Sequence, residues 1–256
     1  TYYNAQTGKY RLAELSERVE NRPLPTVELV DMRTQKEKSG KTPLLSERLI
    51  CEISRTLKNE EQVLLFLNKR GFDTFLVCAE CGYHFRCPNC AVSLKHHLAD
   101  QVIKCHYCGY QQKALPVCPA CRGRRITPYG AGTQKLERDI KKLFPQARVG
   151  RMDADASSSA ASQENILVAL QERKIDILIG TQMIAKGHDF PWITLVGVVS
   201  ADIPLNLPDF RAAEKTFQIL TQVAGRGGRG DNPGKVIIQT FNPQHFVLRH
   251  VQNHNY

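Results

Sequence analysis

Four C-x-x-C pairs constrain the fold of this chain more than any other feature of its sequence. They contain eight of the nine cysteines: Cys78 and Cys81, Cys87 and Cys90, Cys105 and Cys108, and Cys118 and Cys121. A C-x-x-C turn aims two sulfurs at one point, and two such turns complete a tetrahedral four-cysteine zinc site. A disulfide framework is the alternative, but nothing in the sequence indicates secretion. The pairs therefore predict two zinc ions.

Spacing favours one combination of the pairs. The second and third pairs are separated by AVSLKHHLADQVIK, a length that suits a zinc-ribbon hairpin. The first and fourth pairs would then meet in an outer site that clamps the neck of an inserted segment. An interleaved combination remains open, whereas joining the first two pairs across GYHFR looks cramped. Closed four-cysteine sites are structural because no position is left for water, so this small segment should need its metal to fold.

The chain is basic, with a formal net charge of +10. Eight thiolates around two divalent ions would lower this charge to about +6. The remaining excess favours a polyanionic partner. Arg122 and Arg124 follow the fourth pair and could contact DNA phosphates, although a solvated basic turn explains them as well.

Outside the cysteine segment, apolar runs alternate with amphipathic ones. Four runs predict buried strands: QVLLFL (62–67), KIDILIG (174–180), TLVGVVS (194–200) and KVIIQT (235–240). Residues 46–60, 133–145 and 211–225 carry apolar side chains at helical spacing. This alternation predicts an α/β fold, in which helices cover both faces of a parallel sheet.

These patterns suggest a division into domains. We expect residues 46–77 and 122–256 to form the α/β domain, with residues 78–121 inserted as a zinc-binding domain. Residues 1–45 contain one clear strand, TVELVDM, and then a charged linker. SGKT within that linker resembles the end of a Walker A loop, but Gln35 stands where the loop needs glycine and no strand precedes it.

Two loops could contact phosphate groups. GTQMIAKGHDFP (180–191) follows a predicted strand, and ligands of open α/β sheets gather at the carboxyl ends of strands. Gly180, Thr181 and Lys186 could meet a phosphate there, and Asp189 could accept a hydroxyl. GAGT (130–133) leads into a predicted helix, so Thr133 and the free N–H groups could hold a backbone phosphate. An ordinary turn is the alternative reading for both loops.

A third loop, QVAGRGGR, ends a predicted helix and places Arg226 and Arg229 three positions apart among glycines. Two guanidinium groups near one point offer planar forks for phosphate oxygens. Arginines held in this way can stabilise the charge that develops during phosphoryl transfer. A glycine-rich turn before a strand is the alternative.

Together these loops resemble the second motor lobe of superfamily 2 helicases: GTQMIAKGHDFP is similar to the fifth helicase motif and QVAGRGGR to the sixth. The four cysteine pairs inserted after LLFLNKRGF narrow the resemblance to the bacterial replication-restart helicases, the primosomal protein N′ family. The resemblance runs from about Gly8 to the end of the chain. Its motifs agree in both sequence and order.

The resemblance implies a role for several residues. ATP with Mg²⁺ would sit between two RecA-like lobes, where Arg226 and Arg229 reach the γ-phosphate and Gln222 lies beside them. Asp189 would help to couple nucleotide to DNA, and Lys186 and Gly187 would belong to the same nucleotide site. Thr181 would contact the DNA backbone, with Gly180 beside it. The resemblance also implies the nested pairing of the cysteines.

The resemblance further implies an ATP-dependent 3′-to-5′ DNA helicase that acts at stalled replication forks and initiates primosome assembly in the bacterial cytoplasm, near the nucleoid. Its partners would be forked and single-stranded DNA, other primosome proteins and the single-stranded-DNA-binding protein, with no membrane. Walker A and B residues belong to the first lobe, so the chain alone is expected to be inactive. Residues 1–45 would form the end of that first lobe and the link between the lobes. A zinc-dependent DNA-binding scaffold with a decayed nucleotide site and a related remodeller of RNA are the alternatives.

Overall fold

The structure is a computed structural model of the 256-residue chain. The residues that it describes are 2–13, 24–35, 42–67, 75–90, 92–97, 100, 102–129, 132–153, 160–181, 190–207, 209–225 and 234–255.

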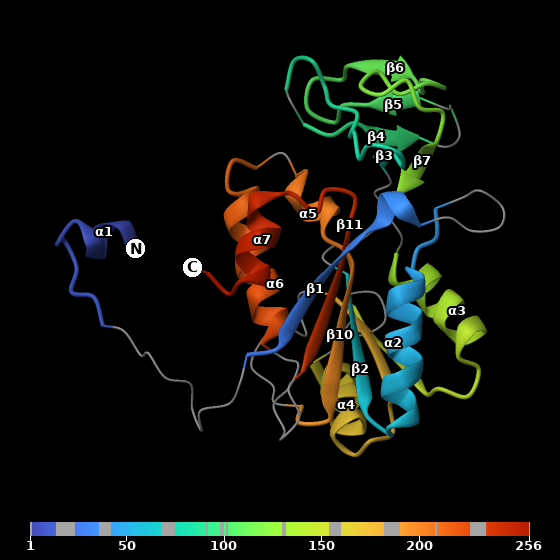
Figure 1. The fold of residues 1–256 in the computed structure, drawn as a ribbon, viewed down its shortest axis with the longest axis vertical. Helices are drawn as coiled ribbons and strands as arrows, with labels where there is room; N and C mark the ends of the chain where they lie inside the picture. Colours follow the sequence, from blue (N-terminus) through green and yellow to red (C-terminus); the bar gives the residue numbers. More distant parts are fainter. Residues whose placement is uncertain are drawn as a thin grey trace.

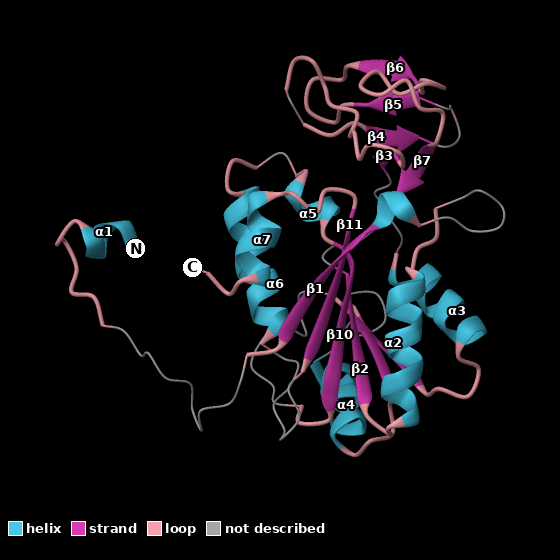
Figure 2. Ribbon diagram, in the orientation of Figure 1, coloured by secondary structure: helices cyan, strands magenta, loops and turns pink. Residues whose placement is uncertain are grey.

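A six-stranded parallel sheet forms the centre of the molecule (Figures 1 and 2). Its strands follow the order β1-β11-β10-β2-β9-β8. Parallel strands covered on both faces read as continuous apolar runs, which is why the buried run QVLLFL forms a strand of this sheet. The bounds are β1 Thr26–Asp31, β2 Gln62–Leu67, β8 Val149–Met152, β9 Ile177–Gly180, β10 Ile193–Ser200 and β11 Lys235–Thr240.

Helices cover both faces of this sheet and bury two separate apolar cores. On one face lie α2 (Glu47–Lys58) and α3 (Thr133–Leu143), packed through Leu49, Ile53, Leu136 and Ile140. On the other lie α4 (Ala160–Gln171), α6 (Ala212–Ala224) and α7 (Phe246–Gln252). The expected fold class, an α/β sheet with helices on both faces, is therefore confirmed.

The cysteine segment forms a second, antiparallel sheet in the order β6-β5-β4-β3-β7. We call residues 75–129 the cysteine-rich module. It lies over the carboxyl ends of the parallel strands, at the top of Figure 1, and has a small core of its own around Leu76, Phe85, Leu94 and Ile103. The bounds are β3 Phe75–Cys78, β4 Lys95–His97, β5 Val102–Lys104, β6 Gln111–Lys113 and β7 Ile126–Tyr129.

Three short elements complete the described chain. They are α1 (Tyr2–Gln6), a 3-10 turn at Met32–Thr34, and α5 (Asp202–Leu205), which follows β10. In Figure 1, α1 stands apart from the two sheets. None of the helices that the structure describes is long and apolar enough to cross a lipid bilayer.

Strand pairing bears on three of the expected domain boundaries. Strand β1, expected in the segment before the α/β domain, pairs in parallel with β11 from Thr26 to Asp31. Arg48 of α2 also donates to Glu28 of β1 at 2.8 Å. The sequence predicted this strand but not its partner, because β11 lies at the far end of the chain. Similarly, β3 and β7 pair with each other and so lengthen the module at both ends.

Candidate functional site

The eight paired cysteines gather into two groups of four. Cys78, Cys81, Cys118 and Cys121 form the outer cluster, and Cys87, Cys90, Cys105 and Cys108 form the inner cluster. In each cluster the sulfur atoms all lie within 4.8 Å of one another. This is the nested combination, and neither the interleaved one nor any disulfide occurs among these cysteines.

The sulfur spacing fits zinc. Sγ–Sγ distances are 3.6 Å for Cys78–Cys121 and 3.7 Å for Cys81–Cys118 in the outer cluster. The distance from Cys87 to Cys108 in the inner cluster is 3.5 Å. A tetrahedral zinc ion with Zn–S bonds of about 2.3 Å separates its sulfurs by about 3.8 Å. Both donor sets therefore have the chemistry and the dimensions of a closed structural zinc site.

Three tight turns bring the sulfurs together. In three of the pairs, the residue after the second cysteine donates its N–H to the carbonyl of the first, at 2.8, 3.1 and 3.0 Å. These residues, Gly82, Gly109 and Arg122, have φ angles of 79°, 75° and 62°. Glycine enters this left-handed region at no steric cost, whereas Arg122 is an uncommon occupant of it. The corresponding residue of the remaining pair, 91, lies outside the described residues.

Burial and neighbouring groups shift the pKa values of these thiols in opposite directions. Burial raises the pKa of Cys81 to about 12, and the contact with Cys108 raises that of Cys90 to about 12. The N–H of Tyr110 lowers the pKa of Cys108 to about 6. Four neighbouring sulfurs thus resist becoming thiolates together at neutral pH, and a divalent cation supplies the charge that overcomes this resistance.

A second candidate site lies at the carboxyl ends of β8 and β9, which are neighbouring strands. Thr181 follows β9 directly, is buried, and its Oγ1 has no hydrogen-bond partner. Thr133 begins α3, and no side chain caps the N-terminus of that helix at Gly132. An uncapped helix N-terminus presents N–H groups and a partial positive charge, which suit a phosphate.

Asp153 belongs to this second site, although it is not among the site residues predicted from the sequence. It follows β8, is buried, and accepts a hydrogen bond from Oγ1 of Thr133. Arg151 lies 3.5 Å from the same carboxylate. The signal that could have found Asp153 is an acidic residue directly after a strand, which becomes meaningful only when the neighbouring strand is known.

The remaining candidates are distributed unevenly. Gly180 is buried at the end of β9, Gln222 is exposed in the last turn of α6, and Arg122 and Arg124 are exposed on the cysteine-rich module. Five candidates lie outside the described residues: Lys186, Gly187, Asp189, Arg226 and Arg229.

Arg125, next to the exposed arginines, has a structural task instead. Its Nη2 donates to the carbonyl of Ala79 at 3.1 Å and to that of Arg33 at 3.3 Å. Ala79 belongs to the cysteine-rich module and Arg33 follows β1. Arg125 therefore ties the module to the parallel sheet.

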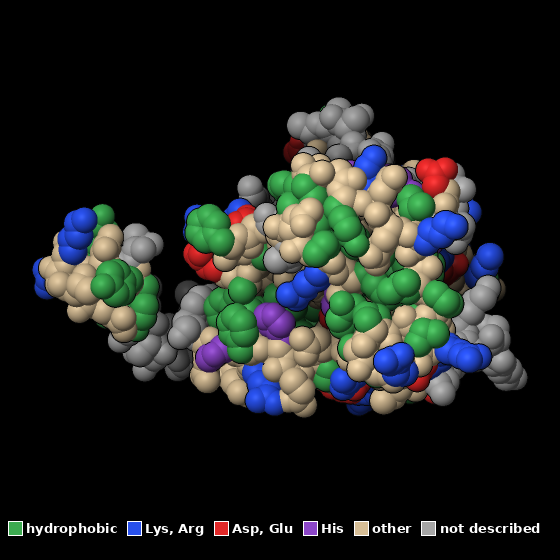
Figure 3. Space-filling model, turned by 90° about the horizontal axis from the view of Figure 1, so that it is seen from above, with side chains coloured by type: hydrophobic (Ala, Val, Ile, Leu, Met, Phe, Trp, Pro, Cys, Tyr) green, Lys and Arg blue, Asp and Glu red, His purple; other side chains and the backbone are tan. Residues whose placement is uncertain are grey.

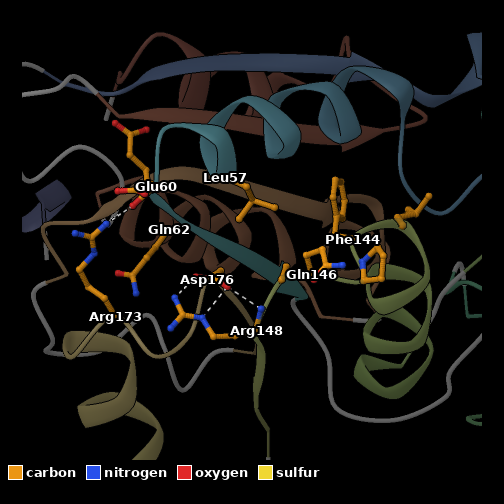
Figure 4. Close-up of a pocket in the computed structure, with 12 residues that line it drawn as sticks. Leu57, Glu60, Gln62, Phe144, Gln146, Arg148, Arg173 and Asp176 are labelled. Atoms are coloured by element: carbon orange, nitrogen blue, oxygen red, sulfur yellow. Dashed lines mark hydrogen bonds and ion pairs between the residues drawn. The ribbon is translucent and has the colours of Figure 1, made fainter.

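A cavity of about 680 Å³ lies at the opposite, amino-terminal edge of the parallel sheet. Figure 4 shows polar groups of the cavity engaged with one another: Arg148 lies beside Asp176, and Arg173 donates to the backbone carbonyl of Glu60. The Arg148 backbone N–H also donates to Asp176 at 2.7 Å. Since these charged groups already have partners, this cavity is a weaker candidate for a ligand than the carboxyl edge.

Two family models match the chain. Residues 87–113 match the PriA DNA helicase Cys-rich region (CRR) domain, and residues 111–231 match the helicase conserved C-terminal domain. Among solved structures, RecG bound to a three-way DNA junction covers 93% of the chain at 11% identity with a TM-score of 0.46, and the chain covers 23% of it. Dbp5 of S. cerevisiae bound to RNA and ADP BeF3 covers 91% at 12% identity with a TM-score of 0.42, and the chain covers 39% of it.

Curated relatives match over nearly the whole chain. The replication restart protein PriA of Bacillus subtilis is 48% identical over 256 residues, which are 100% of this chain and 32% of the relative. PriA of Synechocystis is 44% identical over 95% of this chain and 30% of the relative. PriA of Rickettsia felis is 42% identical over 98% of this chain and 39% of the relative. The chain thus spans about a third of the length of these relatives.

The covered parallel sheet and the match to the helicase C-terminal domain define the class of this protein: it is a helicase C-terminal lobe. The cysteine-rich region and the identity over the whole chain go further. The chain belongs to the PriA family of replication restart proteins.

Proposed function

We propose that this chain supplies the second motor lobe of an ATP-dependent 3′-to-5′ DNA helicase, which acts at stalled replication forks and initiates primosome assembly. The observation that carries the proposal is the 48% identity to PriA of Bacillus subtilis across all 256 residues. The activity belongs to the longer polypeptide, in which a first lobe would bind ATP and Mg²⁺. Primosome proteins and the single-stranded-DNA-binding protein are the partners that such a role requires.

Nucleic acid would cross the carboxyl edge of the parallel sheet. The Thr181 hydroxyl and the N-terminus of α3, which begins at Thr133, would contact the strand there, with Gly180 allowing close approach. Seen from above, basic side chains are spread over the molecule while acidic ones lie mostly toward its margins (Figure 3). That distribution favours a polyanion on this face. Arg122 and Arg124, exposed on the cysteine-rich module, would extend the contact.

The two clusters would each hold one zinc ion, with the cysteines of the outer and inner clusters as ligands. Zinc in a closed four-cysteine site has no position for substrate, so its part is structural. It would fix the cysteine-rich module in place at the edge where the strand passes.

Arg226 and Arg229 would reach the γ-phosphate across the cleft between lobes, with Gln222 nearby, while Lys186, Gly187 and Asp189 would bind the nucleotide. Arg229→Ala in the full-length protein tests this assignment. DNA-stimulated ATP hydrolysis should fall at least a thousandfold, the order expected for such arginines, while DNA affinity stays within about twofold. Arg249→Ala, an exposed residue of α7, is the control. Normal turnover of Arg229→Ala would contradict the assignment.

Thr181→Val tests the nucleic-acid site separately. The change removes the hydroxyl and keeps the shape, so the fold should be unaffected, because the hydroxyl has no partner within the protein. A lost hydrogen bond to a charged phosphate is worth about 1.5–3 kcal/mol, so affinity for single-stranded DNA should fall about tenfold or more in fluorescence anisotropy. Thr194→Val, at the amino end of β10 where Thr194 donates to Glu61, should bind like the wild type.

A further inference from the structure

A polar cavity of about 310 Å³ lies between the cysteine-rich module and the carboxyl ends of β10 and β11. The module contributes His84 and Arg86 to its lining, and the segments after the two strands contribute Asp202, Asn242 and His245. Ligands of open α/β sheets bind in crevices outside the carboxyl ends of strands. This cavity occupies such a place. It lies at the ends of β10 and β11, whereas the site of Thr133 and Thr181 lies at the ends of β8 and β9.

The two walls of the cavity are held in a fixed relation. A Cβ on Gly82 of the module would lie 2.5 Å from the carbonyl oxygen of Phe241, directly after β11. Tyr129 of β7 packs edge-on against Phe241 with ring centroids 4.6 Å apart, and its hydroxyl donates to Val199 of β10 at 3.0 Å. The cavity is therefore part of a packed junction.

The module side of the cavity carries unused hydrogen-bonding groups. Both ring nitrogens of His84 are screened from solvent and have no partner. Buried polar atoms almost always find a partner, and leaving one unmet costs about 1–3 kcal/mol. Among the described residues, the structure gives the Arg86 guanidinium no hydrogen bond or ion pair. These groups would find partners in a ligand.

The opposite side adds a further donor. Nδ1 of His245 accepts a hydrogen bond from the N–H of Val247 at 3.3 Å, where it caps α7. We infer from this bond that Nε2 carries the proton of the neutral ring, since one nitrogen must donate when the other accepts. Burial, and then the positive charge of Arg86, lower the pKa of His84 to about 4 and also lower that of His245. Arg86 lines the same cavity as both rings.

Asp202 is the one carboxylate among the described lining residues. Its Oδ1 accepts from the Thr240 hydroxyl at 2.8 Å, and its Oδ2 accepts from the N–H of Phe241 at 3.0 Å. Burial raises its pKa to about 6. Its oxygens are thus already engaged, and the unused groups of the cavity are mostly donors.

We propose that this cavity binds a phosphate group, with the Arg86 guanidinium, an N–H of His84 and Nε2–H of His245 as donors. A guanidinium beside neutral N–H groups is a strong combination for phosphate oxygens. The phosphate belongs either to the backbone of a nucleic-acid strand that passes under the module or to free phosphate. Bound there, it would join the module to the parallel sheet through one ligand.

Two variants of the 256-residue chain, prepared zinc-replete, remove donors and spare the fold. Arg86→Gln neutralises an exposed side chain. His245→Asn removes Nε2–H and keeps an acceptor that can cap α7. Arg55→Gln is the matched control, because it makes the same charge change on an exposed side chain of α2, which lines a different cavity at the amino edge.

The first measurement follows the histidine ring nitrogens by NMR during addition of inorganic phosphate. The second measures the affinity of a fluorescent twenty-nucleotide oligo(dT) over a range of salt. Each phosphate of a single strand that a cationic side chain neutralises contributes about 0.7 to the magnitude of the slope of log K against log salt.

If free phosphate is the source, inorganic phosphate shifts the His84 and His245 signals in the wild type and in Arg55→Gln but not in Arg86→Gln. If a strand is the source, oligo(dT) shifts the signals, and Arg86→Gln lowers the salt slope by about 0.7. His245→Asn then weakens binding without changing the slope, because its ring is neutral. Either result supports the proposal. Unmoved signals with both probes, or equal effects of Arg86→Gln and Arg55→Gln, would overturn it. A chain that fails to bind oligo(dT) contradicts the proposed function, yet the phosphate titration still decides this site.

Discussion

Two glycines that share one backbone conformation differ in what surrounds them. Gly82 and Gly109 both follow a C-x-x-C pair, with φ angles of 79° and 75°. An added Cβ would meet the carbonyl of Phe241 at Gly82, whereas nothing lies within 4 Å at Gly109. The first glycine is thus required by a contact between the two sheets, and the second only by its turn.

Gly82→Ala should therefore destabilise the chain more than Gly109→Ala. A left-handed backbone alone costs a non-glycine residue about 1–2 kcal/mol, and both variants should show that loss. Gly82→Ala should lose a further 1–3 kcal/mol or so, because the backbone of Phe241 cannot yield as a flexible side chain can. Urea unfolding followed by circular dichroism measures the difference. Equal losses would show that the contact at Phe241 is not tight.

Asp202 should give stability an unusual pH dependence. Burial raises its pKa from 3.8 to about 6, so the folded chain takes up this proton more readily than the unfolded chain. Its contribution to stability is therefore greatest below about pH 4 and falls as pH rises toward 6. At 1.36 kcal/mol per pKa unit the change is about 3 kcal/mol.

Carbon-13 NMR of the carboxyl groups measures this prediction directly. Asp202 should titrate near pH 6, whereas Asp176 should titrate below its ordinary range, because a hydrogen bond from Arg148 lowers its pKa. The stability that Asp176 contributes changes with pH in the opposite direction. It is present above the unfolded pKa and is lost as pH falls through the folded pKa. A pKa of Asp202 at its ordinary value of 3.8 would contradict the prediction that burial disfavours its charged form.

At the scale of elements, the two clusters occupy different parts of the cysteine-rich module. The outer cluster includes Cys78, which ends β3 and pairs with Ile126 of β7. The inner cluster joins the turn that precedes β4 to the turn that follows β5. Loss of the outer site should free the neck of the module, while loss of the inner site should free only its tip.

Cys121→Ser and Cys108→Ser test this difference, because each removes one exposed cysteine from one cluster. Each variant should retain about one zinc ion per chain instead of two by mass spectrometry under native conditions. Hydrogen exchange of β3 and β7 should accelerate in Cys121→Ser and stay slow in Cys108→Ser. Cys51→Ser, an exposed thiol outside both clusters, should keep both ions. Unchanged zinc content in either cluster variant would contradict the ligand assignment.

At the scale of the whole molecule, three apolar cores have different sources of stability. The cores on the two faces of the parallel sheet contain large apolar sets, whereas the core of the cysteine-rich module is small. A small core rarely supplies enough free energy to fold a segment alone. Removal of the metal should therefore unfold the module without unfolding the parallel sheet.

Chelation of zinc should unfold the module and leave the six-stranded sheet folded. The helical circular-dichroism signal should change little, because the helices that the structure describes over the sheet lie outside the module. Amide signals of residues 75–129 should lose dispersion in the same sample. Loss of the helical signal together with the module would show that the parallel sheet also depends on zinc.

Much of the fold could be predicted from the sequence because its determinants are local. Apolar runs such as QVLLFL and amphipathic segments such as that of α3 predicted the class of the fold, and spacing favoured the nested clusters. Strand β1 shows the limit of prediction from local sequence patterns. Its sequence predicted a strand but gave no partner, and its neighbour β11 lies at the other end of the chain.

The candidate sites divide in the same way. The C-x-x-C spacing determined which sulfurs could share a metal, and a threonine after a strand marked the carboxyl edge. Only tertiary structure placed Asp153 beside Thr133 and brought His84 of the module over the strand that precedes His245. The reason is physical: sequence patterns report what neighbouring residues do, whereas a cavity forms where distant segments meet. Here the sequence determined the elements and the metal chemistry, and the packing of one sheet over the other determined the junction between them.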